Sequence, residues 1–193
     1  IATSEAAAVD AAELVDIKFR ELPFVLNQDD ALADESVQLH PDVPNNLATT
    51  FRRGEQNYDE VAKDAAINIK IELRNQRLVP FPLECRAINA SFDPASGRMT
   101  VYIGQQLPHM LRSWLAEALD FPEHKLRVVS PDVGGGFGAK MHFYSEDVAT
   151  AFASCQLGKP VKWSERRREN AVATSHGRDH LTTVEAAAQT DGK

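Results

Sequence analysis

The chain has 193 residues, of which 43% are hydrophobic and 25% charged, as is usual for a globular protein with a sizeable core. Its net charge of −7 argues against nucleic acid as the main partner, because phosphate binding needs a basic surface. The sequence shows no apolar run of membrane-spanning length and no signal peptide, so we expect a cytoplasmic protein without a membrane partner.

The first third of the chain predicts few regular elements. Ser4 is suited to cap a helix over residues 4–15. Apolar and charged residues alternate over residues 15–22, which predicts a half-buried strand ended by Pro23. Residues 34–58 combine prolines, asparagines and a glycine with little periodicity, so we expect a linker or a long wrapped loop there.

From residue 58 onward, helices and strands follow one another without a strict βαβ order, which predicts an α+β fold. Residues 93–97 supply the turn of a hairpin, and Gly158 is placed to end a helix. Strands are predicted over residues 66–73, 86–92, 98–103, 126–129, 160–163 and 180–187, and helices over 58–64, 108–119 and 145–157, with a short helix starting at the arginines 166–168.

The most informative stretch runs from Pro131 to Lys140 and has four glycines in five positions around Phe137. Glycine reaches positive φ at little cost and allows another group to approach the backbone closely. Successive backbone N–H groups in such a loop can converge on an anion or an oxo group. The Phe137 ring has few neighbours between glycines, so we expect it to line a cavity.

Two interpretations of this loop stay open on residue chemistry alone. The spacing of Gly134, Gly136 and Ala139 fits a dinucleotide-binding fingerprint, with Glu165 placed to meet a ribose hydroxyl. The residues 130–132 between strand and glycines argue against it, since that fingerprint turns straight off the strand. In the second interpretation the amide of Gln106, just after a strand, joins the loop N–H groups as a neutral donor set.

Two other pairs of residues suggest weaker hypotheses. His176 and His180 have the four-residue spacing of helical metal ligands, but the surrounding sequence disfavours a helix. Glu84 and Arg86 form either a buried ion pair that shapes the cleft or a simple pair at a strand end. Neither cysteine is part of a CxxC motif, so we expect no iron–sulfur cluster on this chain.

Several segments together resemble the molybdenum-binding large subunit of the xanthine dehydrogenase / aldehyde oxidase / carbon monoxide dehydrogenase family. The resemblance covers nearly the whole chain in order and spacing. It rests on the stretches 74–77 (RNQR), 82–86 (PLECR), 92–98 (FDPASGR), 106–109 (QLPH), 128–140 (VVSPDVGGGFGAK) and 158–163 (GKPVKW).

This resemblance implies an enzyme that oxidises a small organic substrate (an aldehyde, an N-heterocycle or a CO-like molecule) with water as the oxygen source. The cofactor implied is molybdopterin with molybdenum, in its cytosine dinucleotide form, while FAD and 2Fe–2S centres are expected on partner subunits. Gln106 aligns with the glutamine that hydrogen-bonds an oxo ligand of molybdenum, and Phe137 with the aromatic residue that orients substrate. Gly135, Gly136 and Gly138 align with the loop packed against the cofactor, and no residue here is expected to ligate the metal directly.

The resemblance also implies a domain order and a partial chain. Residues 1–41 resemble the end of a small hammerhead domain, 42–65 a linker, and 66–193 the first part of a mixed α+β molybdopterin-binding domain. The family's catalytic glutamate lies outside this chain, so we expect the fragment to be inactive alone and to need the rest of the large subunit. Met141 replaces a glutamate common in purine- and aldehyde-oxidising members, which disfavours a purine substrate. A dinucleotide-binding domain and a non-catalytic assembly fragment remain the alternatives.

Overall fold

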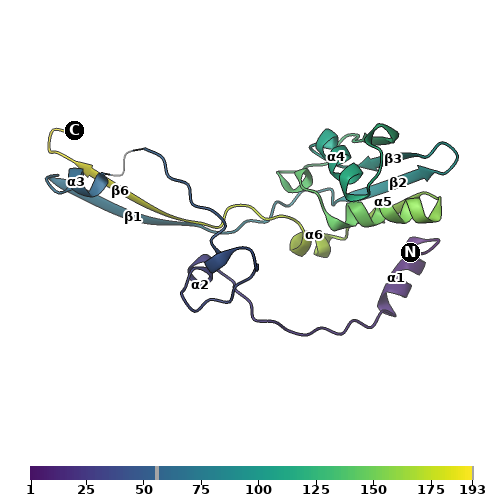
Figure 1. Ribbon diagram of the computed structural model, residues 1–193, viewed down its shortest axis with the longest axis horizontal. Coiled ribbons are helices and arrows are strands. Elements are labelled where there is room, and N and C mark those ends of the chain that lie inside the picture. The colour runs from purple at the N-terminus through teal and green to yellow at the C-terminus, as the bar shows by residue number, and fades with distance from the viewer. Residues whose placement is uncertain (55–56, 193) are drawn as a thin grey trace. The chain divides into compact units, whose positions relative to one another are not determined.

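The computed structural model describes residues 1–54 and 57–192, which form two compact units (Figure 1). One unit comprises residues 1–68 with 186–193, and the other comprises residues 69–185. The second unit holds the predicted site residues. The predicted domain limits at residues 41 and 65 stay a prediction.

The second unit is built on a four-stranded sheet of order β4-β3-β2-β5. The strands β2 (Ala87–Asp93) and β3 (Arg98–Ile103) form the predicted hairpin, closed by a turn in which Asp93 accepts hydrogen bonds from Ala95 N–H and the Ser96 hydroxyl. β5 (Val161–Ser164) pairs antiparallel with β2, and β4 (Leu126–Val129) pairs parallel with β3. The mixture of parallel and antiparallel pairs confirms the α+β prediction.

Two helices cover the buried face of this sheet, α4 (Pro108–Ala118) and α5 (Ser145–Leu157). Alternate residues of β2 and β3 point into the core, because side chains of a strand alternate between its two faces. Pro108 opens α4 and Gly158 ends α5 with φ of 59°, both as predicted. The core comprises Ile88, Ala90, Met99, Val101, Ile103, Leu111, Leu115, Ala116, Leu126 and Ala151.

The connection through α4 brings the two predicted site segments to one edge of the sheet. β3 and β4 are parallel neighbours, so their carboxyl ends lie at the same edge. Gln106 follows β3, and the glycine loop follows β4 before the 3₁₀ turn Ala139–Met141. A short 3₁₀ turn (Glu123–Lys125) precedes β4, and α6 (Arg167–Ala173) follows β5.

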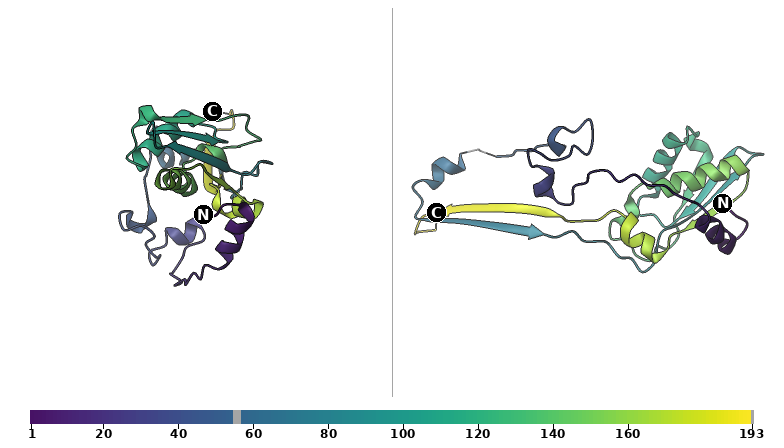
Figure 2. Two further views of the ribbon diagram at one scale, coloured as in Figure 1. Left: turned by 90° about the vertical axis from the view of Figure 1, so that its right-hand side faces the viewer. Right: turned by 90° about the horizontal axis from the view of Figure 1, so that it is seen from below.

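The remaining two strands form a separate ribbon. β1 (Ile67–Asn75) and β6 (His180–Ala188) run side by side (Figure 2) and make up a two-stranded sheet of their own. Every residue of β1 is exposed, including the alternating Ile67, Ile69, Ile71 and Leu73. The strand prediction is therefore confirmed, and its apolar face is open in this structure.

The N-terminal unit contains short helices, α1 (Glu5–Glu13), α2 (Gln28–Ala31) and α3 (Tyr58–Ala62), with a 3₁₀ turn at Pro44–Asn46. Ser4 caps α1 as predicted, because its hydroxyl accepts a hydrogen bond from Ala7 N–H at 3.2 Å. The strand predicted over residues 15–22 is wrong: this segment is irregular and exposed, since alternation makes a strand only where a neighbouring strand pairs with it. Among the described residues, no helix is both long and apolar enough to cross a membrane.

Candidate functional site: Gln106 and the glycine loop

The side-chain amide of Gln106 is turned by the glycine loop. Its Oε1 accepts hydrogen bonds from Gly138 N–H at 3.1 Å and from Lys140 N–H at 3.2 Å. Its backbone N–H donates to Lys140 C=O at 2.8 Å. With the oxygen occupied by two donors, the amide NH₂ of this exposed residue has no hydrogen-bond partner in the described part of the chain. Gln106 is thus oriented as a donor.

The turn that carries Gln106 is held by its neighbour Gln105, which is only 4% exposed. Gln105 Oε1 accepts from Gln106 N–H at 2.8 Å, while its Nε2 donates to His142 C=O at 3.2 Å. The hydroxyl of Ser130 at the end of β4 accepts from Gln105 N–H at 3.1 Å and donates to Gln105 C=O at 2.8 Å. This role of Gln105 was not predicted, because any two adjacent glutamines look alike without their contacts.

Two glycines of the loop are approached closely by side chains of the chain itself. A Cβ on Gly136 would collide with Gln106 Oε1, and one on Gly134 would lie 2.6 Å from Glu84 Cβ. Gly135 and Gly138 have φ of 92° and 90°, a region that side chains disfavour. The close approach predicted from the glycines therefore exists. At Gly134 and Gly136 the approaching group is a side chain of this chain, from Glu84 and Gln106.

The middle of the loop, at Gly136 and Phe137, offers backbone N–H donors beside an exposed aromatic ring. Within the described residues, the N–H groups of Gly136 and Phe137 have no hydrogen-bond partner. Phe137 itself has φ of 51° and is 74% exposed, so its ring lies open at the surface instead of lining a cavity as predicted. Gly135 lies close to this ring, since an added Cβ would be 3.2 Å from Phe137 Cε2.

The ends of the loop are tied by an ion pair that the sequence did not predict. Lys140 Nζ lies 2.5 Å from Glu84 Oε2, and the same oxygen accepts from Gly134 N–H at 2.8 Å. The hydrogen bond from Lys140, together with that from Gly134, holds the pKa of Glu84 below its usual value despite some burial.

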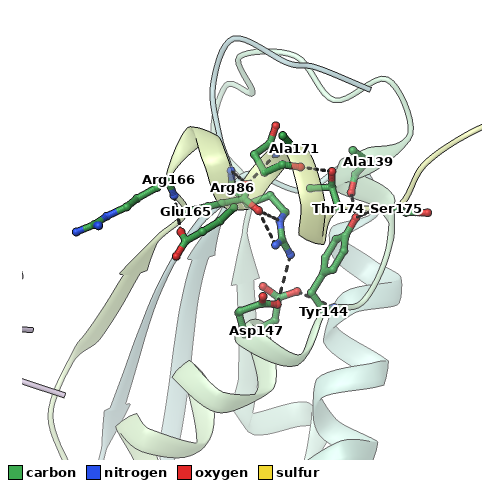
Figure 3. A network of polar contacts seen from close by, with 12 residues as sticks. Arg86, Ala139, Tyr144, Asp147, Glu165, Arg166, Ala171, Thr174 and Ser175 are labelled. Carbon is green, nitrogen blue, oxygen red and sulfur yellow. Dashed lines mark hydrogen bonds and ion pairs between the residues drawn. The ribbon is translucent and has the colours of Figure 1, made fainter. Parts of the chain in front are cut away.

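A second polar network lies under the exit of the loop (Figure 3). The Tyr144 hydroxyl donates to Ala139 C=O at 2.6 Å and accepts from Ser175 N–H at 3.1 Å. The Arg86 guanidinium lies 3.7 Å from the centre of the Tyr144 ring and donates twice to Glu165 Oε1, at 2.6 and 2.9 Å. This network fixes the chain where it leaves the glycines.

Burial and pairing set the charges in this network. Burial alone would lower the pKa of Arg86, but hydrogen bonds and charge from Glu165 outweigh it and raise that pKa. Burial also works to raise the pKa of Glu165, yet its bonds from Arg86 and Asn170 lower it below the usual value. The Asp147 carboxyl is 3% exposed, and burial raises its pKa to about 6.

Several expectations are corrected by these contacts. Glu84 and Arg86 do not pair with each other: Glu84 pairs with Lys140, and Arg86 pairs with Glu165. The residue assigned to a ribose hydroxyl, Glu165, is 6% exposed and committed to Arg86, and the glycines lead into a 3₁₀ turn instead of a helix. Both facts contradict the dinucleotide interpretation.

The other candidate positions lie away from the loop. The described residues contain no group of three His, Cys, Asp or Glu that could hold a metal, and His176 is exposed, with its ring 3.3 Å from Ala171 C=O. One surface hollow of about 200 Å³ includes none of the predicted site residues. It is lined by Pro108, His109, Arg112, Leu126, Arg127, Val128 and Ser130.

What the site defines is a neutral set of donors, one amide NH₂ and two backbone N–H groups, beside an exposed aromatic ring. Residues 39–193 match the family model described as the molybdopterin cofactor-binding domain. The chain therefore belongs to the molybdenum hydroxylase family, whose members are molybdopterin-dependent oxidoreductases. This confirms the resemblance drawn from the motifs.

Individual relatives agree with the family. The chain is 37% identical to the carbon monoxide dehydrogenase large chain of Hydrogenophaga pseudoflava, over all of this chain and 26% of that protein. It is 33% identical to the nicotine 6-hydroxylase large subunit of Paenarthrobacter nicotinovorans, over all of this chain and 24% of the relative. The solved CO dehydrogenase from Oligotropha carboxidovorans superposes with a TM-score of 0.87 at 34% identity, over 97% of this chain and 25% of that one. The chain thus spans about a quarter of the length of these relatives.

Proposed function

We propose that this chain supplies one wall of the cofactor site in a molybdenum hydroxylase, with Gln106 and the loop Gly135–Gly136–Phe137–Gly138 as the contacting residues. The observation that carries the proposal is the orientation of Gln106. Its oxygen is occupied by Gly138 and Lys140 N–H groups, so only its NH₂ can meet an acceptor oxygen of the cofactor. The unpartnered amides of Gly136 and Phe137, among described residues, fit the same acceptor-rich group.

The chain's part in the reaction is placement. Molybdopterin with its molybdenum, when bound, supplies the two-electron oxidation of the substrate, with water as the source of oxygen. Gln106 donates a hydrogen bond without bringing a charge, so it can stabilise negative charge on an oxygen that it contacts. The glycines leave no side chain over the loop, which allows a flat group to lie against the backbone.

Phe137 supplies the substrate side of this wall. Its ring is exposed, and Met141, at 40% exposure, has its sulfur 4.0 Å from where a Gly138 Cβ would be. An aromatic ring and a thioether favour a small neutral substrate, such as an aldehyde, an N-heterocycle or a CO-like molecule, over a purine held by charged groups. The catalytic glutamate is expected on the rest of the large subunit.

The finer points of cofactor and assembly belong to the same proposal. We expect the cytosine dinucleotide form of molybdopterin, and electron transfer to 2Fe–2S and FAD centres on two partner subunits. Relatives described as a "large chain" or "large subunit" support such an assembly. The absence of a CxxC motif in this sequence is consistent with clusters held elsewhere.

Two substitutions of Gln106 in the full-length enzyme test the proposal. Gln106→Ala removes the amide donor and the acceptor of the Gly138 and Lys140 N–H groups, but no metal ligand, so turnover should fall by about 100-fold or more while molybdenum content stays close to that of the wild type. Gln106→Glu keeps the shape but presents a carboxylate oxygen outward, so the loss should be larger. Turnover numbers and metal analysis of the purified complex measure both, and unchanged turnover in either variant would contradict the role of Gln106.

A matched substitution at Phe137 separates substrate placement from cofactor binding. Phe137→Ala should change the relative rates on several small substrates while leaving molybdenum content intact. Equal relative rates would argue against the role of the ring. A complex without molybdenum would contradict the proposal and favour a purely structural fragment.

A further inference from the structure

The ion pair between Glu84 and Lys140 is unusual in its burial. The Lys140 side chain has no exposed surface, whereas that of Glu84 is 46% exposed. Burying an ammonium group is costly unless it is paired, and lysine is among the residues least often buried. Because a pair of apolar side chains would often serve stability equally well, stability alone does not account for this pair.

The ion pair connects the two ends of the glycine loop, each of which is hydrogen-bonded to a neighbouring residue. Gly134, at the entry, is bonded to Glu84 through both its N–H and its C=O, at 2.8 and 3.2 Å. Lys140, at the exit, is bonded to Gln106 through both its N–H and its C=O, at 3.2 and 2.8 Å. The contact of Lys140 Nζ with Glu84 Oε2 joins these two double attachments.

The atoms between the two attachments are those that the proposed site uses. Phe137 holds a positive φ of 51°, a conformation that persists only where the surroundings enforce it. Its N–H and that of Gly136 have no partner in the described chain, so no hydrogen bond of their own fixes their direction. Their placement relative to Gln106 therefore depends on the bond from Gly138 N–H to Gln106 Oε1 and on how the ends of the loop are held.

We propose that Glu84 and Lys140 are positioning residues that set the distance between the Gln106 amide and the Gly136 and Phe137 N–H donors. The inference rests on the proposed function, because it concerns the same donor set. It acts through backbone placement, because the Lys140 side chain is buried and Glu84 Oε2 is bonded to Lys140 Nζ and Gly134 N–H. A displacement of about 1 Å in such donors is enough to lower turnover strongly.

The test uses the full-length enzyme with the double substitution Glu84→Gln and Lys140→Met. This variant leaves no unpaired buried charge, and the introduced glutamine still offers an oxygen to Gly134 N–H, so assembly and molybdenum content should stay close to wild type. The link between the attachments is lost, so kcat should fall about 10–100-fold with KM changed less than about threefold. The electron paramagnetic resonance spectrum of the half-reduced enzyme should change as well, as a readout independent of turnover.

An exposed pair of the same residue types provides the control. Lys70 and Glu185 lie 2.9 Å apart with 62% and 37% exposed side chains. The double substitution Lys70→Met and Glu185→Gln should leave kcat and the spectrum unchanged. Wild-type kcat and spectrum in the Glu84→Gln, Lys140→Met enzyme would overturn the inference. Failure of that enzyme to assemble would also overturn it, since the pair would then serve folding.

The outcomes separate this inference from the proposed function. Absence of molybdenum from the wild-type enzyme, or unchanged turnover in Gln106→Ala, would reject the proposed function itself. Loss of turnover in Gln106→Ala with no effect of the Glu84→Gln, Lys140→Met change would reject only the positioning role of the pair.

Discussion

The same alternation of apolar residues has opposite outcomes in two regions of this molecule. In β2 and β3 the inward residues Ile88, Met99 and Val101 are at most 1% exposed, beneath α4 and α5. In β1 the matching residues Ile67 and Ile69 are 47% and 51% exposed. Alternation therefore predicts which residues share a face of a strand, but not what covers that face.

The apolar face of the two-stranded β1–β6 ribbon is exposed, whereas that of the four-stranded sheet is already covered by α4 and α5. A two-stranded sheet is marginally stable by itself in water, and a row of exposed isoleucines adds an unfavourable apolar surface. The proposed remainder of the large subunit is the natural source of that cover. Three sets of substitutions sharpen the comparison between the covered sheet and the open ribbon.

The largest loss of stability is expected for Arg86→Met, at the residue that directly precedes β2. This change leaves the Glu165 carboxylate buried without its ion partner, which should lower the free energy of unfolding by about 3–5 kcal/mol. Urea unfolding of the chain measures this loss. Adding Glu165→Gln should recover much of the stability. Lys70→Met in the ribbon, where the pair is exposed, should have little effect, and equal losses at both pairs would break the comparison.

An isoleucine in each region gives the most direct comparison. Ile88→Ala opens a cavity in the core and should lower the free energy of unfolding by about 2–5 kcal/mol. Ile69→Ala in this chain should cost less than about 1 kcal/mol, because its side chain is half exposed. In the full-length subunit the cost of Ile69→Ala should rise toward that of Ile88→Ala. No rise would show that the ribbon face is not covered.

The smallest and pH-dependent effect is expected at Asp147, on the helix that covers the sheet. Its pKa is about 6 in the folded chain against 3.8 for the free side chain, so the folded state binds more protons between these values. The free energy of unfolding should therefore fall as pH rises from about 4 to about 6, by at most about 2–3 kcal/mol, and then level off.

The variant Asp147→Asn isolates this contribution. The introduced asparagine can still accept the hydrogen bond from Tyr144 N–H, which is 3.2 Å long in the structure, but it cannot ionise. The variant should lack this part of the pH dependence and be more stable than the wild type above a pH of about 6. Parallel curves for the two proteins across this range would contradict the raised pKa.

Local patterns predicted most of the fold. The turn at residues 93–97, Pro108 and Gly158 mark element ends through their own backbone preferences, and the structure confirms all three. The strand predicted over residues 15–22 is wrong because its existence depends on a pairing partner that the pattern cannot reveal.

The site shows the same division between local and distant information. Gln106 and the glycines were predicted because their residue types suit the chemistry and match a family, and their role in the site stays a proposal. Their supports were missed, because Glu84 and Lys140 are 56 positions apart and Arg86 and Glu165 are 79 apart. Proximity in sequence suggested a Glu84–Arg86 pair instead, and the fold brings a different partner to each.

The crowding at Gly134 and Gly136 bears on how such sequences are recognised in genomes. Even a methyl group at either place would collide with Glu84 or Gln106, whether or not a ligand is present. A descendant that had lost its cofactor would remain under pressure to retain Gly134 for as long as Glu84 persisted, whereas the end of the Gln106 side chain can turn away from Gly136. The glycine motif alone therefore indicates common descent and not a retained activity. A better indicator of retained activity is a side chain that the fold itself does not need, such as the exposed ring of Phe137.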